Sequence, residues 1–513
     1  MSALRGLRSD PVGSQPLVVA LTDGTASLTW AALDLVLDRA VDALRGLDTG
    51  LASRVAVMAA NSVETVVAHA ALALAGLSGV PLSTHLAAGE VEHALRVSGA
   101  GVVLTGPETV DVARSAAATV GGVQVVAWRA ARPGVASWEA VLAAAATEPA
   151  PLDLVPLPPL MFTSGTTGRP KAVEQPPTTF PGGATVAELV ERLQDNPLAA
   201  ASPHLVVGPL HHTGPLTAVR LLLAGTALVV LPRFDAESVL RAVQEHHIAG
   251  TVMVPTHFTR LLALPEEVRD AYDTSSLEQV VHTGAACPVA LKHRMIAWWG
   301  PVLTEAYGGT EVGTTNSIDS AEWLAHPGSV GRAVPPYEVL VLDDAGEQVP
   351  TGTTGQLCFR DATGRGLVYA DGSGAQRSPY PPGVFTLGEV GHVDADGYVY
   401  ITDRSSDLVV SGGVNIYPAE VEGVLTAVPG VVDAAAFGVL HAEMGEQLRA
   451  LVVVDDPALT PTALLEHCRS RLAHYKCPRE LTLVDELPRT PMGKLDKRAL
   501  RSRYGGGVAV STA

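Results

Sequence analysis

Cysteine is scarce in this sequence. Only four occur among 513 residues, Cys287, Cys358, Cys468 and Cys477, and no two have the Cys-x-x-Cys spacing of zinc or redox sites. Disulfide-stabilised proteins are richer in cysteine and occur in oxidising compartments. We therefore expect a reduced, cytoplasmic protein without a zinc site.

Long apolar runs are also missing. The longest, 221–231, falls far short of the ~20 residues that a membrane-spanning helix needs. Residues 1–10 contain arginines, but no apolar core of the signal-peptide type follows them. The sequence thus predicts no membrane span and no targeting segment.

Positive charge is in deficit. Lys and Arg number 35 against 53 Asp and Glu, which gives a net charge of −18. This balance argues against a general nucleic-acid binder and against binding to anionic membranes, although a local basic pocket can still hold an anion.

Length and composition predict a large mixed α/β protein. Apolar residues make up 47% of the chain and charged residues 17%, without low-complexity bias or an internal repeat. At ~150 residues per domain, the chain is long enough for about three units.

Strand and helix patterns alternate in the first part of the chain. Strands are expected at 17–21, 54–58, 79–81, 101–105 and 123–128, and helices at 31–47, 62–75, 88–98 and 110–119. A second block of the same kind runs from 205 to 299. This alternation predicts parallel strands with helices packed on both faces.

The pattern then changes. Segments 337–342 and 356–359 flank a turn at 343–346 and predict antiparallel strands of a small sheet or barrel. From residue 403 onward, about 100 residues have their own strand and helix pattern and can form a separate domain. We expect 505–513 to be disordered.

Segment 161–171 has the most distinctive chemistry. Two glycines three residues apart permit close approach of a ligand, four hydroxyls can bond phosphate oxygens, and Arg169 and Lys171 add positive charge. The spacing is not that of the P-loop in kinases and GTPases. The segment follows an apolar strand at 160–162, and loops that follow strands of α/β sheets commonly bind ligands. We expect a triphosphate site here, with a polar surface turn as the alternative.

The segment Tyr307-Gly308-Gly309-Thr310-Glu311 follows an apolar strand. A nucleotide site can use the ring to stack on a base, the hydroxyl on a phosphate oxygen and the carboxylate on Mg²⁺. A plain turn at the end of a strand is the alternative.

Carboxylates further along have two interpretations. Asp396-Gly397 lies between apolar runs and is the usual signal of a structural hairpin turn. Glu389 and Asp403-Arg404 stand nearby. Acidic side chains can accept from ribose hydroxyls, but a solvated charge is the commoner fate of a carboxylate.

Two more segments are ambiguous when taken alone. Segment 491–497 carries Lys494 and Lys497 and can be a solvated basic turn. The pair His211-His212 suggests a metal site, but no further ligand stands at metal spacing and most of the 16 histidines are not ligands.

Taken together, these segments resemble the acyl-adenylate-forming superfamily, which includes acyl-CoA synthetases, adenylation domains of peptide synthetases, and luciferases. The resemblance covers the chain from about residue 17 to 500. Five motifs occur in the family's order: 163–171, 209–214, 307–311, 385–404 with 411–422, and 491–497.

The resemblance implies the domain organisation. An N-terminal adenylation domain, 1–403, consists of parallel α/β subdomains and a small β-barrel-like part. A hinge at 404–407 precedes a small mobile α+β domain, 408–504, which carries the catalytic lysine, and 505–513 forms the tail.

The family's reaction implies a role for each motif. A carboxylate attacks the α-phosphorus of ATP and expels pyrophosphate, and the thiol of coenzyme A then displaces AMP from the acyl-AMP. The implied cofactors are ATP, Mg²⁺ and coenzyme A, and the substrate is a hydrophobic carboxylic acid. Catalytic roles fall to Lys494, Thr310, Glu311 and His212. Cofactor binding falls to Thr163, Ser164, Gly165, Thr166, Thr167, Gly168, Lys171, Gly284, Ala285, Ala286, Tyr307, Gly308, Glu389, Arg404 and Gly413, and Mg²⁺ to Glu311 and Thr166.

Two positions depart from the family pattern. The ribose-binding aspartate is Glu389 here, one methylene longer, and we expect it still to bind ribose. The hinge position, generally aspartate or lysine, is Ser406. Serine there motivates an alternative, an adenylation-only ligase that hands acyl-AMP to an acyl carrier protein or a partner enzyme.

The resemblance leaves several identities open. The acid is a fatty acid or a bulky terpenoid, steroid or polyketide acid, and the chain acts as a monomer or a homodimer. A nucleotide-binding module without catalysis is a third hypothesis. The set of Lys171, Glu311, Arg404 and Lys494 argues against it.

Overall fold

The computed structural model describes most of the chain. The described ranges are 18–50, 53–163, 171–343, 345–369, 380–381, 383–404, 407, 409–411, 414–416, 418–441, 445–472, 474–489 and 495–504. For residues 403, 404, 410, 414, 415, 445, 475 and 498 only the backbone is described. No helix within these ranges is long and apolar enough to cross a bilayer.

The first unit is a parallel sheet of order β4-β3-β5-β6-β7, as the alternating pattern predicts. Its strands are β3 (Arg54–Met58), β4 (Ser78–Pro81), β5 (Val102–Thr105), β6 (Gln124–Ala127) and β7 (Ala136–Ser137). Its helices are α1 (Trp30–Arg45), α2 (Val63–Leu74), α3 (Ala88–Ser98), α4 (Val110–Val120) and α5 (Trp138–Ala144). Thr29 and Ser62 cap α1 and α2, because their hydroxyls accept from otherwise unpaired first-turn amides.

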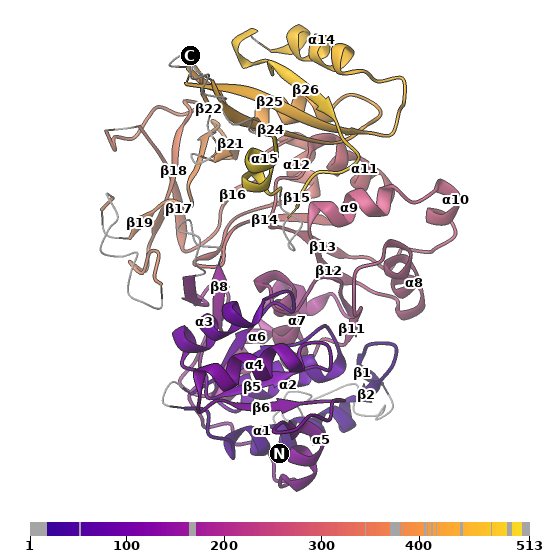
Figure 1. Cartoon of the computed structure of the whole chain (residues 1–513), viewed down its shortest axis with the longest axis vertical. Coiled ribbons are helices and arrows are strands. Elements are labelled where there is room, and N and C mark those ends of the chain that lie inside the picture. Colours follow the sequence, from indigo (N-terminus) through magenta and orange to yellow (C-terminus); the bar gives the residue numbers. More distant parts are fainter. Residues whose placement is uncertain are drawn as a thin grey trace, which may run out of the picture.

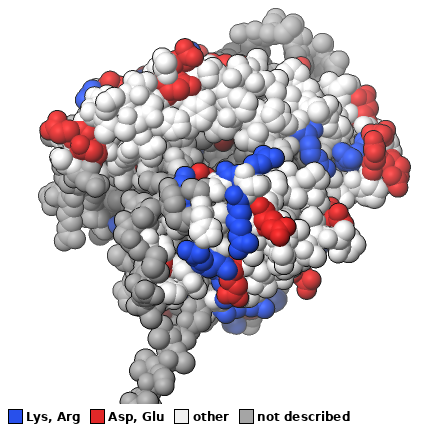
Figure 2. All heavy atoms as spheres, turned by 90° about the horizontal axis from the view of Figure 1, so that it is seen from above, with Lys and Arg blue, Asp and Glu red and all other residues white. Residues whose placement is uncertain are grey.

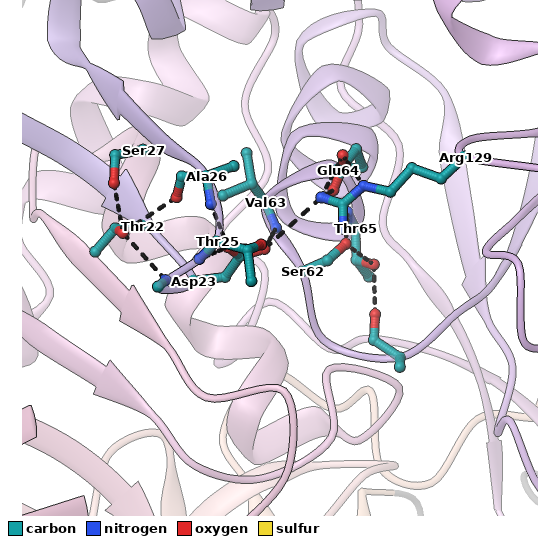
Figure 3. Close-up of polar contacts among 12 residues, drawn as sticks. Thr22, Asp23, Thr25, Ala26, Ser27, Ser62, Val63, Glu64, Thr65 and Arg129 are labelled. Carbon is teal, nitrogen blue, oxygen red and sulfur yellow. Dashed lines mark hydrogen bonds and ion pairs between the residues drawn. The ribbon is translucent and has the colours of Figure 1, made fainter. Parts of the chain in front are cut away.

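A polar network ties the N-terminal hairpin to this unit (Figure 3). Asp23 is 7% exposed, and its carboxylate accepts hydrogen bonds of 2.8–3.1 Å from three backbone amides. These amides belong to Thr25, Ala26 and Val63. Beside it, Arg129 binds Glu64 through two bonds of 2.7 and 2.6 Å. Burial raises the pKa of Asp23, but its hydrogen bonds outweigh that effect and hold the pKa below its usual value. The network is satisfied within the chain, so we interpret it as structural.

The second unit is a nine-stranded sheet of order β16-β15-β14-β13-β12-β10-β11-β1-β2. Its strands are β1 (Val19–Thr22), β2 (Ser27–Thr29), β10 (His204–Val206), β11 (Leu228–Val230), β12 (Gly250–Met253), β13 (Gln279–His282), β14 (Leu303–Gly309), β15 (Gly313–Asp319) and β16 (Arg332–Ala333). Strands β1 and β10 to β14 are parallel, and β2, β15 and β16 add antiparallel edges.

Helices connect these strands and cover them. They are α6 (Val186–Gln194), α7 (Thr213–Leu223), α8 (Ala236–His246), α9 (Pro255–Leu262), α10 (Glu266–Arg269), α11 (Val289–Trp299) and α12 (Ser320–Ala325), with the 3-10 helix η1 (Pro197–Ala200). Helix α7 packs against both α2 and α6, so the two units share one apolar core.

An antiparallel sheet and a C-terminal unit complete the fold. The antiparallel sheet contains β17 (Tyr337–Leu342), β18 (Gly355–Asp361), β19 (Val384–Phe385), β20 (Glu389–Val393) and β21 (Val399–Arg404). The C-terminal unit contains β22 (Val409–Ser411), β23 (Val414–Ile416), β24 (Val431–His441), β25 (Gly445–Val454), β26 (Glu480–Leu483), α13 (Pro418–Thr426), α14 (Pro461–Arg471), α15 (Lys497–Tyr504) and the 3-10 helix η2 (His474–Lys476). Figure 1 shows this yellow and orange unit at the opposite end of the molecule from the indigo N-terminal helices, and α13 packs against β21 of the antiparallel sheet.

One expected strand has a different setting. β8 (Leu160–Thr163) forms where the sequence predicts a strand, but it pairs antiparallel with β9 (Lys171–Glu174) in a two-stranded ribbon. The expectation that segment 161–171 follows a strand of an α/β sheet is therefore wrong. Close return of the chain after a short connection allows an antiparallel partner, whereas a parallel one needs a long crossover.

Candidate active site

Strand β14 is the centre of the candidate site. Tyr307, Gly308 and Gly309 end this strand and pair with β15. Thr310 and Glu311 lie in the turn that joins the two strands, where Val312 N donates to Gly309 O at 3.2 Å. A Cβ on Gly308 would lie only 1.9 Å from the carbonyl oxygen of Gly313. Glycine is therefore required for the two strands to pair at this position.

Two motifs far apart in sequence meet at Tyr307. Its hydroxyl donates to Oε2 of Glu389 at 2.8 Å, and Glu389 is only 5% exposed. Glu389 begins β20, where Gln356 Nε2 donates to its carbonyl oxygen at 2.6 Å and to Thr386 Oγ1 at 2.7 Å. No motif in the sequence points to Gln356 as a site residue. Across the strands, Glu389 pairs with the backbone of Arg404.

A third motif meets β14 at its end. The hydroxyls of Thr310 and Thr213 lie 3.3 Å apart, and Thr213 is the first residue of α7. His212 precedes it at the N-cap position, with its ring 4.2 Å from that of His211. Burial, then the charges of His212 and other nearby histidines, lowers the pKa of His211 to about 3. His211 is therefore neutral at physiological pH.

A buried amide holds the histidine loop in place. Asn61 is 6% exposed, and its Nδ2 donates to the carbonyl oxygens of Gly208 at 2.9 Å and Leu231 at 3.1 Å. Its Oδ1 accepts from the amide of Leu210 at 2.9 Å. Asn61 thus joins the loops that follow β10 and β11. Its role could not be predicted, because a lone Asn after a strand is typical of an ordinary turn.

Two charged site residues have partners that the sequence did not indicate. Arg365 Nη1 donates to the carbonyl oxygen of Glu311 at 3.3 Å. Among the residues that the structure describes, the half-buried Glu311 carboxylate has neither an ion pair nor a hydrogen bond, so it can take a cation. Lys171 Nζ lies 4.5 Å from the ring centroid of Tyr369, a cation–π distance.

The segment Gly284–Ala286 leaves the sheet beside β14. His282, the last residue of β13, is in register with Glu305, so the chain after it continues alongside Tyr307. Beneath this point, Lys292 Nζ binds Glu305 Oε2 at 2.8 Å with Lys292 fully buried. Burial raises the pKa of Glu305, and the nearby ammonium offsets part of that rise. The buried pair anchors α11 to β14 under the site.

Some expected site residues cannot be placed. Ser164, Gly165, Thr166, Thr167, Gly168, Gly413 and Lys494 lie outside the described residues, as does Ser406, and only the backbone of Arg404 is described. Thr163 and Lys171 are described and face each other as the last paired residues of the ribbon.

Two ambiguous features have structural answers. The Asp394–Tyr398 segment is the expected β-turn, since Gly397 N donates to Asp394 O at 3.1 Å and Asp394 N to Tyr398 O at 3.0 Å. Within the described part of the chain, no group of three His, Cys, Asp or Glu side chains is arranged to hold a metal ion. The two adjacent histidines therefore have no described third ligand.

Comparison with known proteins agrees with this arrangement. The sequence profile "AMP-binding enzyme" matches residues 10–366, and "AMP-binding enzyme C-terminal domain" matches 420–494. The chain is 32% identical to the long-chain-fatty-acid–CoA ligase FadD13 of Mycobacterium tuberculosis, over 94% of each chain. It is 34% identical to a feruloyl-CoA synthase of Amycolatopsis sp, over 98% of this chain and 99% of the other.

Solved structures give the same result. The ATP-bound structure of MatB from Rhodopseudomonas palustris superposes with a TM-score of 0.81 at 29% identity, over 98% of this chain and 99% of the other. The first profile alone covers more than half of the chain, and the second lies within the C-terminal unit. The chain belongs to the AMP-binding enzyme family, in its acyl-CoA synthetase branch.

Proposed function

We propose that this enzyme uses ATP and Mg²⁺ to activate a hydrophobic carboxylic acid to its acyl-AMP and then transfers the acyl group to coenzyme A. In the first step a carboxylate oxygen bonds to the α-phosphorus as the bond to the leaving pyrophosphate breaks. In the second, the thiol sulfur bonds to the acyl carbon, AMP leaves, and the thiol proton is released.

The meeting of three motifs at the end of β14 carries this proposal. Tyr307 contacts Glu389, and Thr310 contacts Thr213 next to His212. A ring, a buried carboxylate and two hydroxyls at the carboxyl edge of a parallel sheet suit an adenosine and its α-phosphate. His212, beside them, would face the acid.

The described residues also suit the metal and the triphosphate. Mg²⁺ prefers carboxylate oxygens, and the Glu311 carboxylate has no described partner. We assign Glu311 and Thr166 to this ion, which would supply positive charge beside the phosphates when bound. Lys171, at the end of the ribbon, would add charge from the protein itself.

We further propose that 408–504 moves as the mobile domain, with its pivot at 404–407. Asp407 Oδ1 lies 3.2 Å from Arg501 Nη2, and Lys497 Nζ lies 3.8 Å from Asp407 Oδ2 and 3.2 Å from Glu422 Oε1. These contacts attach Asp407 to α15 and support a pivot at the N-terminal side of that residue.

Charge is distributed unevenly between the two proposed domains. Residues 408–504 contain 11 Lys and Arg and 12 Asp and Glu, whereas the whole chain has 35 and 53, so nearly all of the net charge lies outside this domain. Figure 2, which views the end of the molecule carrying this domain, shows basic side chains across the middle of the face with acidic ones among them. A nearly neutral domain can approach a polyanionic nucleotide without strong repulsion.

The proposal is tested by pyrophosphate release with ATP, Mg²⁺ and a panel of fatty, aryl and polycyclic acids, each with and without coenzyme A. Mass detection of acyl-AMP and acyl-CoA follows the two steps. Acyl-CoA from the best acid supports the full reaction and names its substrate class. Accumulation of acyl-AMP that coenzyme A does not consume would replace it with the adenylation-only alternative, which the CoA-ligase names of the relatives do not favour.

A further inference from the structure

Helix α7 carries a buried cation that the reaction described above does not use. Arg220 is 7% exposed, and its guanidinium donates to Gln175 Oε1 at 3.0 Å and to Thr217 Oγ1 at 2.7 Å. Both partners are neutral. Among the residues that the structure describes, no Asp or Glu forms an ion pair with Arg220.

This arrangement is unfavourable for stability. Burial lowers the pKa of Arg220 to about 10, so the side chain remains charged at neutral pH. A buried charge without a counter-ion costs free energy that neutral hydrogen-bond acceptors offset only in part. An apolar residue of similar length would avoid this cost. The presence of an arginine therefore points to a role in function and not in stability.

The space next to Arg220 offers it no counter-ion. A small cavity of about 30 Å³ between α2, α6 and α7 has Arg220 and His69 in an otherwise apolar wall. Its described lining contains no carboxylate that could pair with this cation.

Arg220 instead connects two elements of the candidate site. Thr213, Thr217 and Arg220 recur at i, i+4 and i+7 and therefore share one face of α7. Thr217 Oγ1 donates to the carbonyl oxygen of Thr213 at 3.3 Å, and Thr213 touches Thr310. From Arg220, polar contacts thus reach Thr310, whose hydroxyl is one of the two that our proposal places at the α-phosphate.

The second element is the β8–β9 ribbon. Gln175 directly follows β9 and is 3% exposed, and its backbone N–H donates to Pro159 O at 3.0 Å, which closes the open end of the ribbon. Lys171 lies at the other end of β9, roughly 13 Å away at ~3.3 Å per residue. Arg220 therefore fixes the base of the ribbon to the helix whose first residue touches Thr310.

We propose that Arg220 is a positioning residue for adenylation, which holds the ribbon that carries Lys171 and the helix that carries Thr213 in the register needed to bind one triphosphate. This inference rests on the proposed function. The planar guanidinium suits the task because it binds Gln175 and Thr217 at once with fixed geometry.

The test compares Arg220→Met, Arg220→Lys and Gln175→Met with the wild-type chain. Calorimetry gives the Kd for ATP with Mg²⁺, pyrophosphate release gives kcat and KM, and thermal unfolding gives the midpoint. We expect Arg220→Met to keep or raise the midpoint while weakening ATP binding about tenfold. Arg220→Lys retains the charge but cannot bind Gln175 and Thr217 at once with the same geometry, so its loss of ATP affinity should be intermediate. The double variant Arg220→Met/Gln175→Met should lose no more ATP affinity than the weaker-binding single variant, because both substitutions break the same hydrogen bond between Arg220 and Gln175.

Arg241→Met on α8 is the matched control, since Arg241 is exposed and its pair with Glu237 is a surface contact of 3.4 Å. A merely structural role would lower the midpoint and the active fraction and leave the Kd unchanged. Kd values within twofold of wild type for Arg220→Met and Gln175→Met would overturn the inference. If Arg220→Met does not fold, Gln175→Met alone decides it. Absence of pyrophosphate release by the wild-type chain would count against the proposed function, while the Kd comparison would still decide the role of Arg220.

Discussion

The Tyr307 hydroxyl donates to the Glu389 carboxylate at 2.8 Å, and this bond joins β14 of the large parallel sheet to β20 of the antiparallel sheet. The two residues come from different motifs, 82 positions apart. In our assignment one bounds the adenine and the other binds the ribose. A single contact would therefore couple the orientation of the base site to that of the sugar site.

We expect Tyr307→Phe to weaken ATP binding about tenfold and to lower the free energy of unfolding by roughly 1.5–3 kcal/mol. The substitution keeps the ring and removes one hydrogen bond to a carboxylate, a bond type that contributes roughly 1.5–3 kcal/mol. Glu389 would then be less well oriented toward the ribose. The Kd for ATP with Mg²⁺, measured by calorimetry, checks this result.

Tyr400→Phe is a suitable control for that experiment. Tyr400 is also on the antiparallel sheet, but its hydroxyl lies 3.5 Å from His326 Nδ1, away from the nucleotide assignment. Unchanged ATP affinity in Tyr307→Phe would contradict the coupling of the two sites.

Asn61→Ala should reduce both stability and use of the acid. The change removes three hydrogen bonds and leaves two carbonyl oxygens and one amide buried without them, which should cost about 2–4 kcal/mol. Because the freed loop leads into His212, KM for the acid should rise more than KM for ATP. Urea unfolding and steady-state kinetics measure the two effects.

The control is Asn196→Ala, which removes one capping bond of η1 at 3.0 Å and should cost only about 1 kcal/mol. Equal rises in the two KM values for Asn61→Ala would show that Asn61 does not act through the histidine loop.

Stability should fall as the pH drops from about 6.5 to 4. Burial lowers the pKa of His69 and of His204 from 6.5 to about 4 in the folded chain. Between these values the unfolded chain binds protons that the folded chain refuses, so protonation favours unfolding. The contribution of each neutral histidine to the free energy of unfolding is fully present above pH 6.5 and is lost progressively toward pH 4. The loss is about 3 kcal/mol per histidine, at 1.36 kcal/mol per pH unit.

Urea unfolding at several pH values checks this expectation. His69→Leu should flatten the dependence between pH 6.5 and 4, whereas the same substitution at exposed His474 serves as the control. A stability that is constant over this range would contradict the assignment of buried, neutral histidines.

Much of the fold could be predicted because local patterns determined it. The apolar run 54–58 is the buried strand β3, and the hydroxyl of Thr29 caps α1, as threonine directly before a helix commonly does. The Asp396-Gly397 turn also forms as its sequence indicates. These features depend on neighbouring residues alone, namely periodicity, capping and turn chemistry.

Features that depend on distant partners could not be predicted in this way. Nothing near Gln356 or Asn61 in the sequence indicates which backbone groups they bind, because those groups lie 33 residues or more away. The antiparallel setting of β8 is likewise decided by its partner β9. The family resemblance assigned Tyr307 and Glu389 to one site, but the hydrogen bond between them is known only from the structure.

Lys494→Ala should abolish most adenylation while leaving the fold intact. We assign its ammonium to neutralise charge that grows on the α-phosphate in the transition state, and loss of one such group commonly costs 10²- to 10³-fold in kcat. Removal of a single lysine charge should change stability little. Thermal unfolding and pyrophosphate release with the best acid measure both quantities.

A supplied acyl-AMP separates loss of adenylation from general damage. Because we assign Lys494 to the adenylation step alone, Lys494→Ala should still convert acyl-AMP and coenzyme A to acyl-CoA. Lys476→Ala, which breaks a 2.8 Å ion pair with Glu420 in the same domain, is the control and should retain both steps. Undiminished pyrophosphate release by Lys494→Ala would contradict the assignment of this lysine to the adenylation step.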